Sequence, residues 1–160
     1  MSNSYVVNVR VNGRDYQRSV EARESLADFL RHGLGMTGTH IGCEHGVCGA
    51  CVIRFDGKIT RSCLTLAVQA DGHEIETIEG LSSSGEIADL QEAFHERNAL
   101  QCGFCTPGML LTAAELLDSH ESPSREEIRD FLSGNLCRCT GYQAIIDAVE
   151  RVAINRQEKK

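Results

Sequence analysis

The sequence contains no tryptophan, only two prolines and only 5% aromatic residues. No apolar run approaches the roughly 18 residues that a membrane-spanning helix needs, so the sequence predicts no membrane span. Basic residues are in the minority, because 16 Lys and Arg stand against 23 Asp and Glu and leave a net charge of −7. This acidic balance argues against nucleic acid or anionic membranes as the main partner. Residues 1–10 also lack the basic-then-apolar pattern of a secretory signal, which favours a cytoplasmic location.

Cysteine, by contrast, is abundant. A chain of 160 residues with 41% hydrophobic residues is globular and long enough for one domain or two small ones. Such a chain builds a core without disulfide staples, and cytosolic thiols stay reduced, so a disulfide framework is a weak interpretation. Metal binding is the better account of the eight cysteines, which are Cys43, Cys48, Cys51, Cys63, Cys102, Cys105, Cys137 and Cys139.

The first half of the chain has the pattern of a small mixed sheet that holds one helix. Alternating apolar residues end at Asn12-Gly13 and at Asp56-Gly57, which are both hairpin turn signals. A short helix begins near Leu26 and stops near Gly33. The expected strands are residues 6–11, 15–20, 51–55, 59–61 and 74–78.

The second half has helical periodicity. Capping boxes are expected at Ser83 with Glu86 and at Ser124 with Glu127, and Thr106-Pro107 suits a helix start. Apolar stripes then predict four helices of a small bundle. The Gly- and Ser-rich residues 80–85 are expected to be a linker. This divides the chain into domains at residues 1–80 and 81–160 and gives an α+β fold class.

The first cysteine group has the spacing of a plant-type [2Fe–2S] site. Three cysteines follow the pattern Cys43-x4-Cys48-x2-Cys51, and the fourth, Cys63, comes after a predicted hairpin. Zinc sites favour two C-x2-C pairs or mixtures of Cys and His at closer spacing, so zinc is the weaker interpretation. Glycine permits positive φ and lets backbone N–H groups approach sulfur, and five glycines lie in or before this loop: Gly35, Gly38, Gly42, Gly46 and Gly49.

The second cysteine group consists of Cys102-x2-Cys105 and Cys137-x-Cys139. Each pair precedes the start of a predicted helix, where free backbone N–H groups and the helix dipole favour negative charge. A [2Fe–2S] cluster with four thiolates is an anion, so these four thiols predict a second cluster. The alternative is ordinary buried cysteine, which two tight pairs at helix starts make the weaker interpretation.

Three motifs together resemble a known family. They are Gly42-Cys-Glu-His-Gly-Val-Cys-Gly-Ala-Cys51, Gln101-Cys-Gly-Phe-Cys-Thr-Pro-Gly108 and Gly134-Asn-Leu-Cys-Arg-Cys-Thr-Gly-Tyr142. The chain resembles, over residues 5–155, the iron–sulfur small subunit of the molybdenum hydroxylases, which include xanthine dehydrogenase and aldehyde oxidoreductase. The resemblance implies an N-terminal β-grasp [2Fe–2S] ferredoxin-like domain and a C-terminal four-helix [2Fe–2S]-binding domain.

The resemblance also implies partners and a role. A large subunit would hold the molybdenum–pterin cofactor and a medium subunit FAD, in a dimer of heterotrimers. The cluster of the helical domain would lie nearer the pterin, and that of the ferredoxin-like domain nearer the flavin. Gln101 and Cys139 match positions that approach the pterin. The chain would relay electrons from molybdenum to FAD during hydroxylation with water-derived oxygen, and would hold no substrate site or catalytic residue of its own.

Two other functions remain open at the level of sequence. One is a free two-cluster ferredoxin without fixed partners, and the other is a zinc-stabilised interaction module. The substrate of the complex is also open among N-heteroaromatic compounds, aldehydes, carbon monoxide and aromatic thioesters. The first cysteine loop is similar to that of N-heterocycle oxidoreductases, which points towards N-heteroaromatic substrates.

Overall fold

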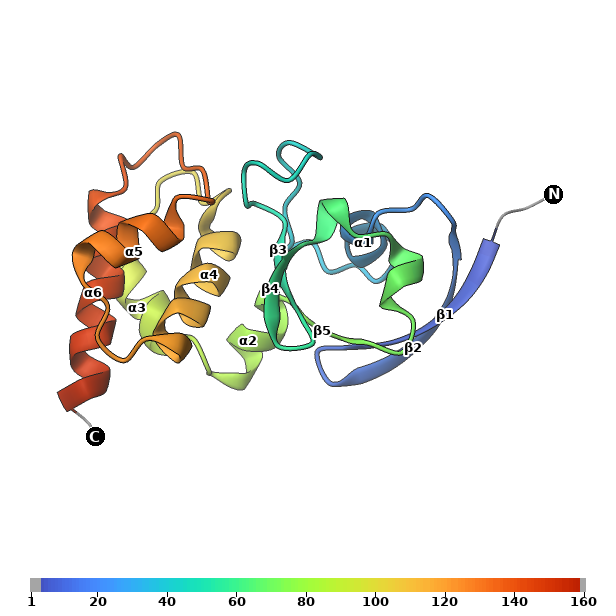
Figure 1. Ribbon diagram of the computed structural model, residues 1–160, viewed down its shortest axis with the longest axis horizontal. Helices are drawn as coiled ribbons and strands as arrows, with labels where there is room; N and C mark the ends of the chain where they lie inside the picture. The colour runs from blue at the N-terminus through green and yellow to red at the C-terminus, as the bar shows by residue number, and fades with distance from the viewer. Residues whose placement is uncertain (1–3, 159–160) are drawn as a thin grey trace.

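The computed structural model describes residues 4–158, so residues 1–3 and 159–160, the outer ends of the two expected domains, lie outside the described residues. A sheet-containing half and a helical half lie side by side, and the two chain ends are at opposite ends of the molecule (Figure 1). No helix within residues 4–158 is long and apolar enough to cross a membrane.

The first half contains a five-stranded sheet with the order β2-β1-β5-β3-β4. β1 and β2 form the expected hairpin, and its turn places Asn12 at φ 50° and Gly13 at φ 75°. Positive φ at both central residues is the requirement of a type I′ turn, which explains the Asn-Gly pair. β5 runs parallel to β1 and antiparallel to β3. The strands are β1 Ser4–Val11, β2 Arg14–Glu21, β3 Val52–Phe55, β4 Lys58–Arg61 and β5 Glu74–Glu76.

The sheet wraps around one short helix, as a β-grasp domain requires. Helix α1, Leu26–Asp28, begins at Ser25, whose hydroxyl accepts a hydrogen bond from the Asp28 backbone N–H. It continues as a single wide turn over Phe29–Gly33. Leu26, Phe29 and Leu30 are buried in one core with the inward residues of β1, namely Val7, Val9 and Val11. The β-grasp expectation is therefore confirmed.

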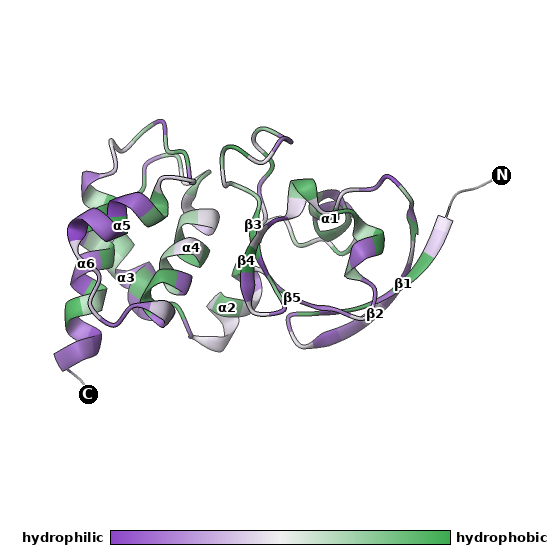
Figure 2. Ribbon diagram, in the orientation of Figure 1, coloured by the Kyte–Doolittle hydropathy of each residue, from purple (hydrophilic) through white to green (hydrophobic). Residues whose placement is uncertain are grey.

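The second half is built from helices packed around a separate core. Figure 2 shows hydrophobic residues concentrated along the central helix α4 and hydrophilic residues on the outer parts of α5 and α6. The Ser124–Glu127 capping box at the start of α5 is confirmed, with both reciprocal hydrogen bonds present. The helices are α2 Ile78–Ser84, α3 Ala88–Glu96, α4 Thr106–Ser119, α5 Arg125–Leu132 and α6 Gln143–Glu158.

Residues 78–86 are where the sequence-based expectation is wrong. The segment expected to be a linker forms helix α2, and Ile78 begins this helix instead of ending a strand. The expected Ser83–Glu86 capping box does not cap α3, because the N-cap residue of α3 is Ile87. The reason is packing, because Ile78 and Leu81 are buried in the helical core. Glycine at position 80 allows the helix to lie against the β1–β2 turn, since a Cβ there would overlap the Asn12 side chain.

Strand β3 belongs to both cores. Val52 packs into the helical core and Ile53 into the sheet core, as the alternation of side chains along a strand dictates. The next residue, Arg54, is only 7% exposed. Its guanidinium lies 2.5 Å from the Glu86 carboxylate and 3.1 Å from the carboxylate of Asp118 at the end of α4. Burial acts against the charged form, but these carboxylates raise the pKa of Arg54. Arg54 thus joins the two halves by ion pairs.

We expect Arg54→Met to lower the free energy of unfolding by about 2 kcal/mol, because it removes buried hydrogen bonds between charged groups. The partly exposed carboxylates can be rehydrated, which keeps the loss below that of a fully buried pair. Arg23→Met is the matched control, since Arg23 is 92% exposed and pairs with Glu21 at 3.5 Å. Urea titration should show a change below about 0.5 kcal/mol for this control. Equal losses in the two variants would show that the Arg54 ion pairs do not join the halves.

Candidate functional site

Three loops carry seven of the eight cysteines, and Cys63 lies directly after β4. The three loops lie along one edge of the molecule, the upper edge in Figure 1. The first loop runs from the end of the α1 turn to β3 and contains Cys43, Cys48 and Cys51. The second precedes α4, and the third precedes α6. The chain therefore brings together at one edge the two groups that are separate in the sequence.

The first group consists of two pairs of thiols. The Cys48 backbone N–H donates to Cys43 Sγ over 3.5 Å. The backbone N–H groups of His45 and Cys48 lower the pKa of Cys43 to about 6. Cys63 follows β4, and burial together with the neighbouring Cys51 thiol raises the pKa of Cys63 to about 11. Backbone N–H groups therefore stabilise negative charge on Cys43, whereas Cys63 is partly desolvated.

Glycine shapes the first loop at specific positions. Gly46 and Gly49 have φ of 81° and 73°, in the left-handed region that glycine occupies without strain. A Cβ at Gly42, whose φ is not positive, would lie 3.1 Å from Cys48 Sγ. The positive φ expected for this loop is thus confirmed at Gly35, Gly46 and Gly49, whereas Gly38 and Gly42 provide close approach instead.

The second group also consists of two pairs. Cys139 Sγ lies 3.6 Å from Cys102 Sγ, well beyond the bond length of a disulfide. Burial and a hydrogen bond to Cys137 raise the pKa of Cys105 to about 12. Burial of Cys137 opposes the ionisation of its thiol, but hydrogen bonds from the hydroxyl and backbone N–H of Thr140 outweigh burial and lower the pKa of Cys137. As in the first group, hydrogen-bond donors stabilise negative charge on one sulfur.

Thr140 and Tyr142 support this group and were not singled out from the sequence. The Thr140 hydroxyl donates to Cys137 Sγ over 3.1 Å. The Cys137 backbone N–H donates to the Tyr142 hydroxyl over 2.8 Å. The only sequence signal for Thr140 and Tyr142 is a hydroxyl side chain within five positions of a predicted ligand. Such hydroxyl residues are common, so the signal does not single these two out.

The pairing of thiols fits a binuclear cluster. A [2Fe–2S] cluster is held by four thiolates, two on each iron, so its ligands form two pairs rather than one tight shell. Cys43 with Cys48, Cys51 with Cys63, Cys102 with Cys139 and Cys105 with Cys137 are such pairs. Within residues 4–158, no group of three or more His, Cys, Asp or Glu is arranged to hold a single metal ion.

The two cysteine groups are joined directly. The Leu136 backbone N–H donates to the Cys48 carbonyl over 2.8 Å, and Leu136 is the neighbour of Cys137. Arg61 donates to the carbonyl of Gly46 at 3.3 Å and to that of Gly134 at 2.8 Å. His40 stacks on Phe104 with ring centres 4.6 Å apart. A route of covalent bonds with one hydrogen bond therefore connects the two groups of thiols.

Gln101, Cys102 and Cys139 are all exposed at this edge. The structure places Gln101 directly beside Cys102, whose sulfur contacts Cys139. Both residues for which the sequence predicts an approach to a pterin are thus accessible from outside the chain. Their role stays a prediction.

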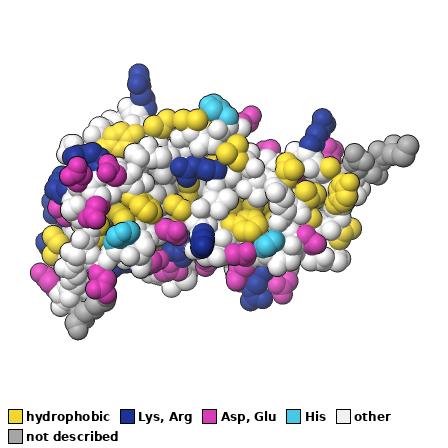
Figure 3. All heavy atoms as spheres, in the orientation of Figure 1, with side chains coloured by type: hydrophobic (Ala, Val, Ile, Leu, Met, Phe, Trp, Pro, Cys, Tyr) yellow, Lys and Arg dark blue, Asp and Glu magenta, His cyan; other side chains and the backbone are white. Residues whose placement is uncertain are grey.

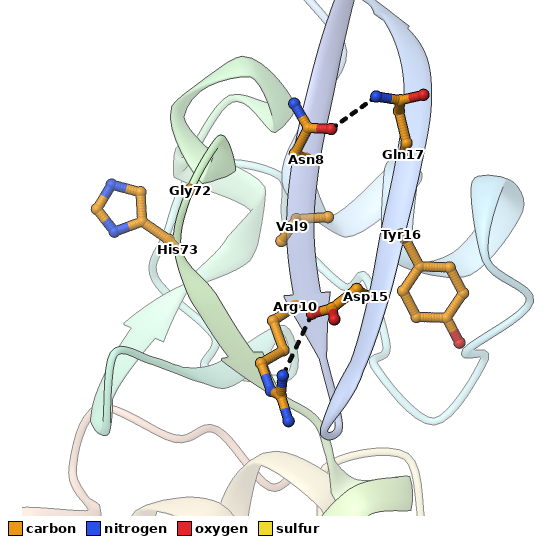
Figure 4. A pocket seen from close by; sticks show the side chains of 8 residues that line it. All are labelled: Asn8, Val9, Arg10, Asp15, Tyr16, Gln17, Gly72 and His73. Atoms are coloured by element: carbon orange, nitrogen blue, oxygen red, sulfur yellow. Dashed lines mark hydrogen bonds and ion pairs between the residues drawn. The ribbon is translucent and has the colours of Figure 1, made fainter.

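One hollow of the sheet half lies elsewhere and is not part of this site. It measures about 360 Å³ and is lined by residues of β1, β2 and the segment before β5. Figure 4 shows the Asn8–Gln17 and Arg10–Asp15 contacts across the hairpin, with Tyr16 and His73 turned away to opposite sides. Acidic and basic side chains are interspersed on the face drawn in Figure 3.

Comparison with known proteins agrees with this geometry. A family model described as "2Fe-2S iron-sulfur cluster binding domain" matches residues 9–82, and one described as "[2Fe-2S] binding domain" matches residues 77–150. The two matches overlap at α2, the helix between the halves.

Relatives match over nearly the whole chain. The chain is 58% identical to caffeine dehydrogenase subunit gamma of Pseudomonas sp. (strain CBB1), covering 94% of this chain and 92% of that protein. It is 58% identical to the nicotine 6-hydroxylase small subunit of Paenarthrobacter nicotinovorans, covering 89% and 86%. The crystal structure of quinoline 2-oxidoreductase from Pseudomonas putida 86 matches with a TM-score of 0.92 and 52% identity, covering 99% of this chain and 98% of that chain. Two [2Fe–2S] domains in this order and these relatives show that the chain belongs to the iron–sulfur small subunits of the molybdenum hydroxylases, the xanthine dehydrogenase and aldehyde oxidoreductase family.

Proposed function

We propose that this chain is the electron-transfer subunit of a cytoplasmic molybdenum hydroxylase that acts on an N-heteroaromatic compound, and that its eight cysteines hold two [2Fe–2S] clusters. The observation that carries the proposal is the arrangement of eight thiols as two pairs in each of two groups, with the groups joined by the Leu136–Cys48 hydrogen bond. When bound, the clusters supply one-electron redox centres.

The protein itself provides geometry and electrostatics. Backbone N–H groups at Cys43 and the Thr140 hydroxyl at Cys137 stabilise negative charge on sulfur, which tunes the potential of a bound cluster. The Cys48 carbonyl and the Leu136 N–H hold the two ligand loops in contact.

Contact with a partner subunit is supported by the surface at the first cysteine group. Val47 and Leu64 are 55% and 61% exposed, and a Cβ on Gly46 would overlap Leu64, so they flank the first cysteine group. Large apolar side chains exposed together mark contact sites for other proteins. We assign this surface to the flavin subunit and the edge with Gln101, Cys102 and Cys139 to the molybdenum–pterin subunit. A dimer of such heterotrimers is the proposed assembly.

The substrate class follows from the relatives. Caffeine, nicotine and quinoline, which the names of three relatives contain, are all N-heterocycles. The substrate pocket is proposed to lie in the molybdenum subunit, so substrate identity is a property of the complex rather than of this chain.

Metal content tests the proposal. The chain purified with its partners is expected to contain about four irons and four acid-labile sulfides, the sum of two [2Fe–2S] clusters. Electron paramagnetic resonance of the reduced protein should show two distinct signals, and chelation of iron should abolish both. A colourless chain with bound zinc, or fewer irons than this, would refute it. Co-purification with a large and a medium subunit separates this function from that of a free ferredoxin.

A further inference from the structure

Asn135 is a fully polar side chain in a buried position, only 1% exposed, between the two cysteine groups. It lies two residues before Cys137, at the start of the third cysteine loop. Buried amides are costly unless their hydrogen bonds are satisfied, so its partners reveal what it holds together.

The Asn135 amide links the two halves of the protein. Its Nδ2 donates to the Gly49 carbonyl over 3.2 Å, and Gly49 is the residue after Cys48. Its Oδ1 accepts from the Thr112 hydroxyl of α4 over 3.1 Å. A carbonyl can only accept, so the orientation of the amide is fixed by Gly49. One side chain therefore contacts the first cysteine loop and the helix that follows Cys105.

Close backbone packing surrounds this amide. A Cβ on Gly49 would lie 2.6 Å from the Gly134 carbonyl oxygen and 2.7 Å from Asn135 Cγ. A Cβ on Gly108 would overlap the Gly49 carbonyl oxygen. The two loops and α4 thus meet with no spare space, and a shift of Asn135 must move Leu136, whose N–H donates to Cys48.

We propose that Asn135 is a positioning residue that sets the spacing of the two cysteine groups, and so determines how fast electrons pass between clusters held there. This inference rests on the proposed function. Asn135 acts through the loops and touches no cysteine sulfur in the described contacts, so its loss should leave each cluster bound and alter only their mutual arrangement.

Asn135→Leu tests this in the complete chain with its partner subunits, since leucine is similar in size and makes neither hydrogen bond. Magnetic interaction between the two reduced clusters splits their electron paramagnetic resonance lines, and we expect this splitting to change in the variant. The iron content should stay the same. Electron transfer between the clusters should slow by a few-fold, because the rate falls steeply as the distance between two redox centres grows. Thr112→Val removes only the hydrogen bond to Oδ1 and should have a smaller effect in the same direction.

Arg54→Met is the control for general loosening, because it breaks the ion pair to Asp118, which lies at the opposite end of α4 from Cys105. It should leave the splitting unchanged. The proposal is overturned if Asn135→Leu leaves splitting and rate unchanged, or if Arg54→Met alters them equally. If Asn135→Leu does not fold, Thr112→Val decides in the same way. An unaltered chain without two clusters would instead refute the proposed function.

Discussion

Cys48→Ser is expected to abolish one cluster signal and to stop electrons from reaching the flavin. Cys48 belongs to the first cysteine group, and a serine oxygen is a harder and poorer ligand for a cluster iron than thiolate sulfur. Turnover with an acceptor that takes electrons from flavin should fall by more than about 100-fold, since even the loss of supporting contacts around a metal site costs up to that much. The second group shares no thiol with the first, so its signal should remain.

Cys102→Ser is the complementary variant. It is expected to abolish the other signal and to block the exit of electrons from the molybdenum subunit, because Cys102 and Cys139 are the exposed pair assigned to that side. Rapid mixing with substrate should distinguish the two. In Cys48→Ser the remaining cluster becomes reduced while flavin stays oxidised, whereas in Cys102→Ser the remaining cluster also stays oxidised.

Glu44→Gln is the matched control in the same loop, since Glu44 is exposed and lies between Cys43 and Cys48. It should retain both signals and near-normal turnover. Loss of the same signal in both cysteine variants would show that the ligand groups are wrongly assigned. Reduction of the remaining cluster by substrate at the normal rate in Cys102→Ser would show that the order of the two groups is reversed.

The sequence was most informative where chemistry depends on spacing. Cys43, Cys48 and Cys51 are close in the chain, so their loop and their common site follow from local geometry. The same holds for the Asn12-Gly13 turn and the Ser124–Glu127 capping box, which involve only neighbouring residues. From the sequence, the segments 102–105 and 137–139 are linked by the number of ligands, by their common place at helix starts and by the family resemblance. The structure supplies the contact between Cys102 and Cys139.

Features that depend on contacts between the halves could not be predicted. Residues 80–85 have the composition of a linker, yet Leu81 is buried and makes this segment a helix. An arginine in a predicted strand suggests a side chain exposed to solvent. In the structure Arg54 is buried, because its guanidinium pairs with Asp118 of α4. Asn135 has no local signal at all, because its partners Gly49 and Thr112 are 86 and 23 residues away. Such residues become visible only when the two cores are placed against each other.

The junction between the halves leads to the second large expected effect, that of Gly49→Ala. Gly49 has φ 73°, a conformation that costs an alanine about 1–2 kcal/mol. The added Cβ would also lie 2.6 Å from the Gly134 carbonyl oxygen, which is backbone and cannot rotate away. Overpacking of this kind adds about 1–3 kcal/mol, so we expect a total loss of about 3 kcal/mol in the free energy of unfolding.

Gly13→Ala separates the two contributions. Gly13 has nearly the same φ, 75°, but no atom lies within 4 Å of its Cβ position. Anaerobic urea titration should therefore give a loss of only about 1 kcal/mol for this variant. Gly49 lies in the first cysteine loop and contacts Gly134 and Asn135 of the third. Gly49→Ala should therefore also lower the occupancy of both clusters, whereas Gly13→Ala should lower neither. Equal effects of the two substitutions on stability and iron content would mean that the loops separate easily, and that contact at Gly49 does not hold the two halves in register.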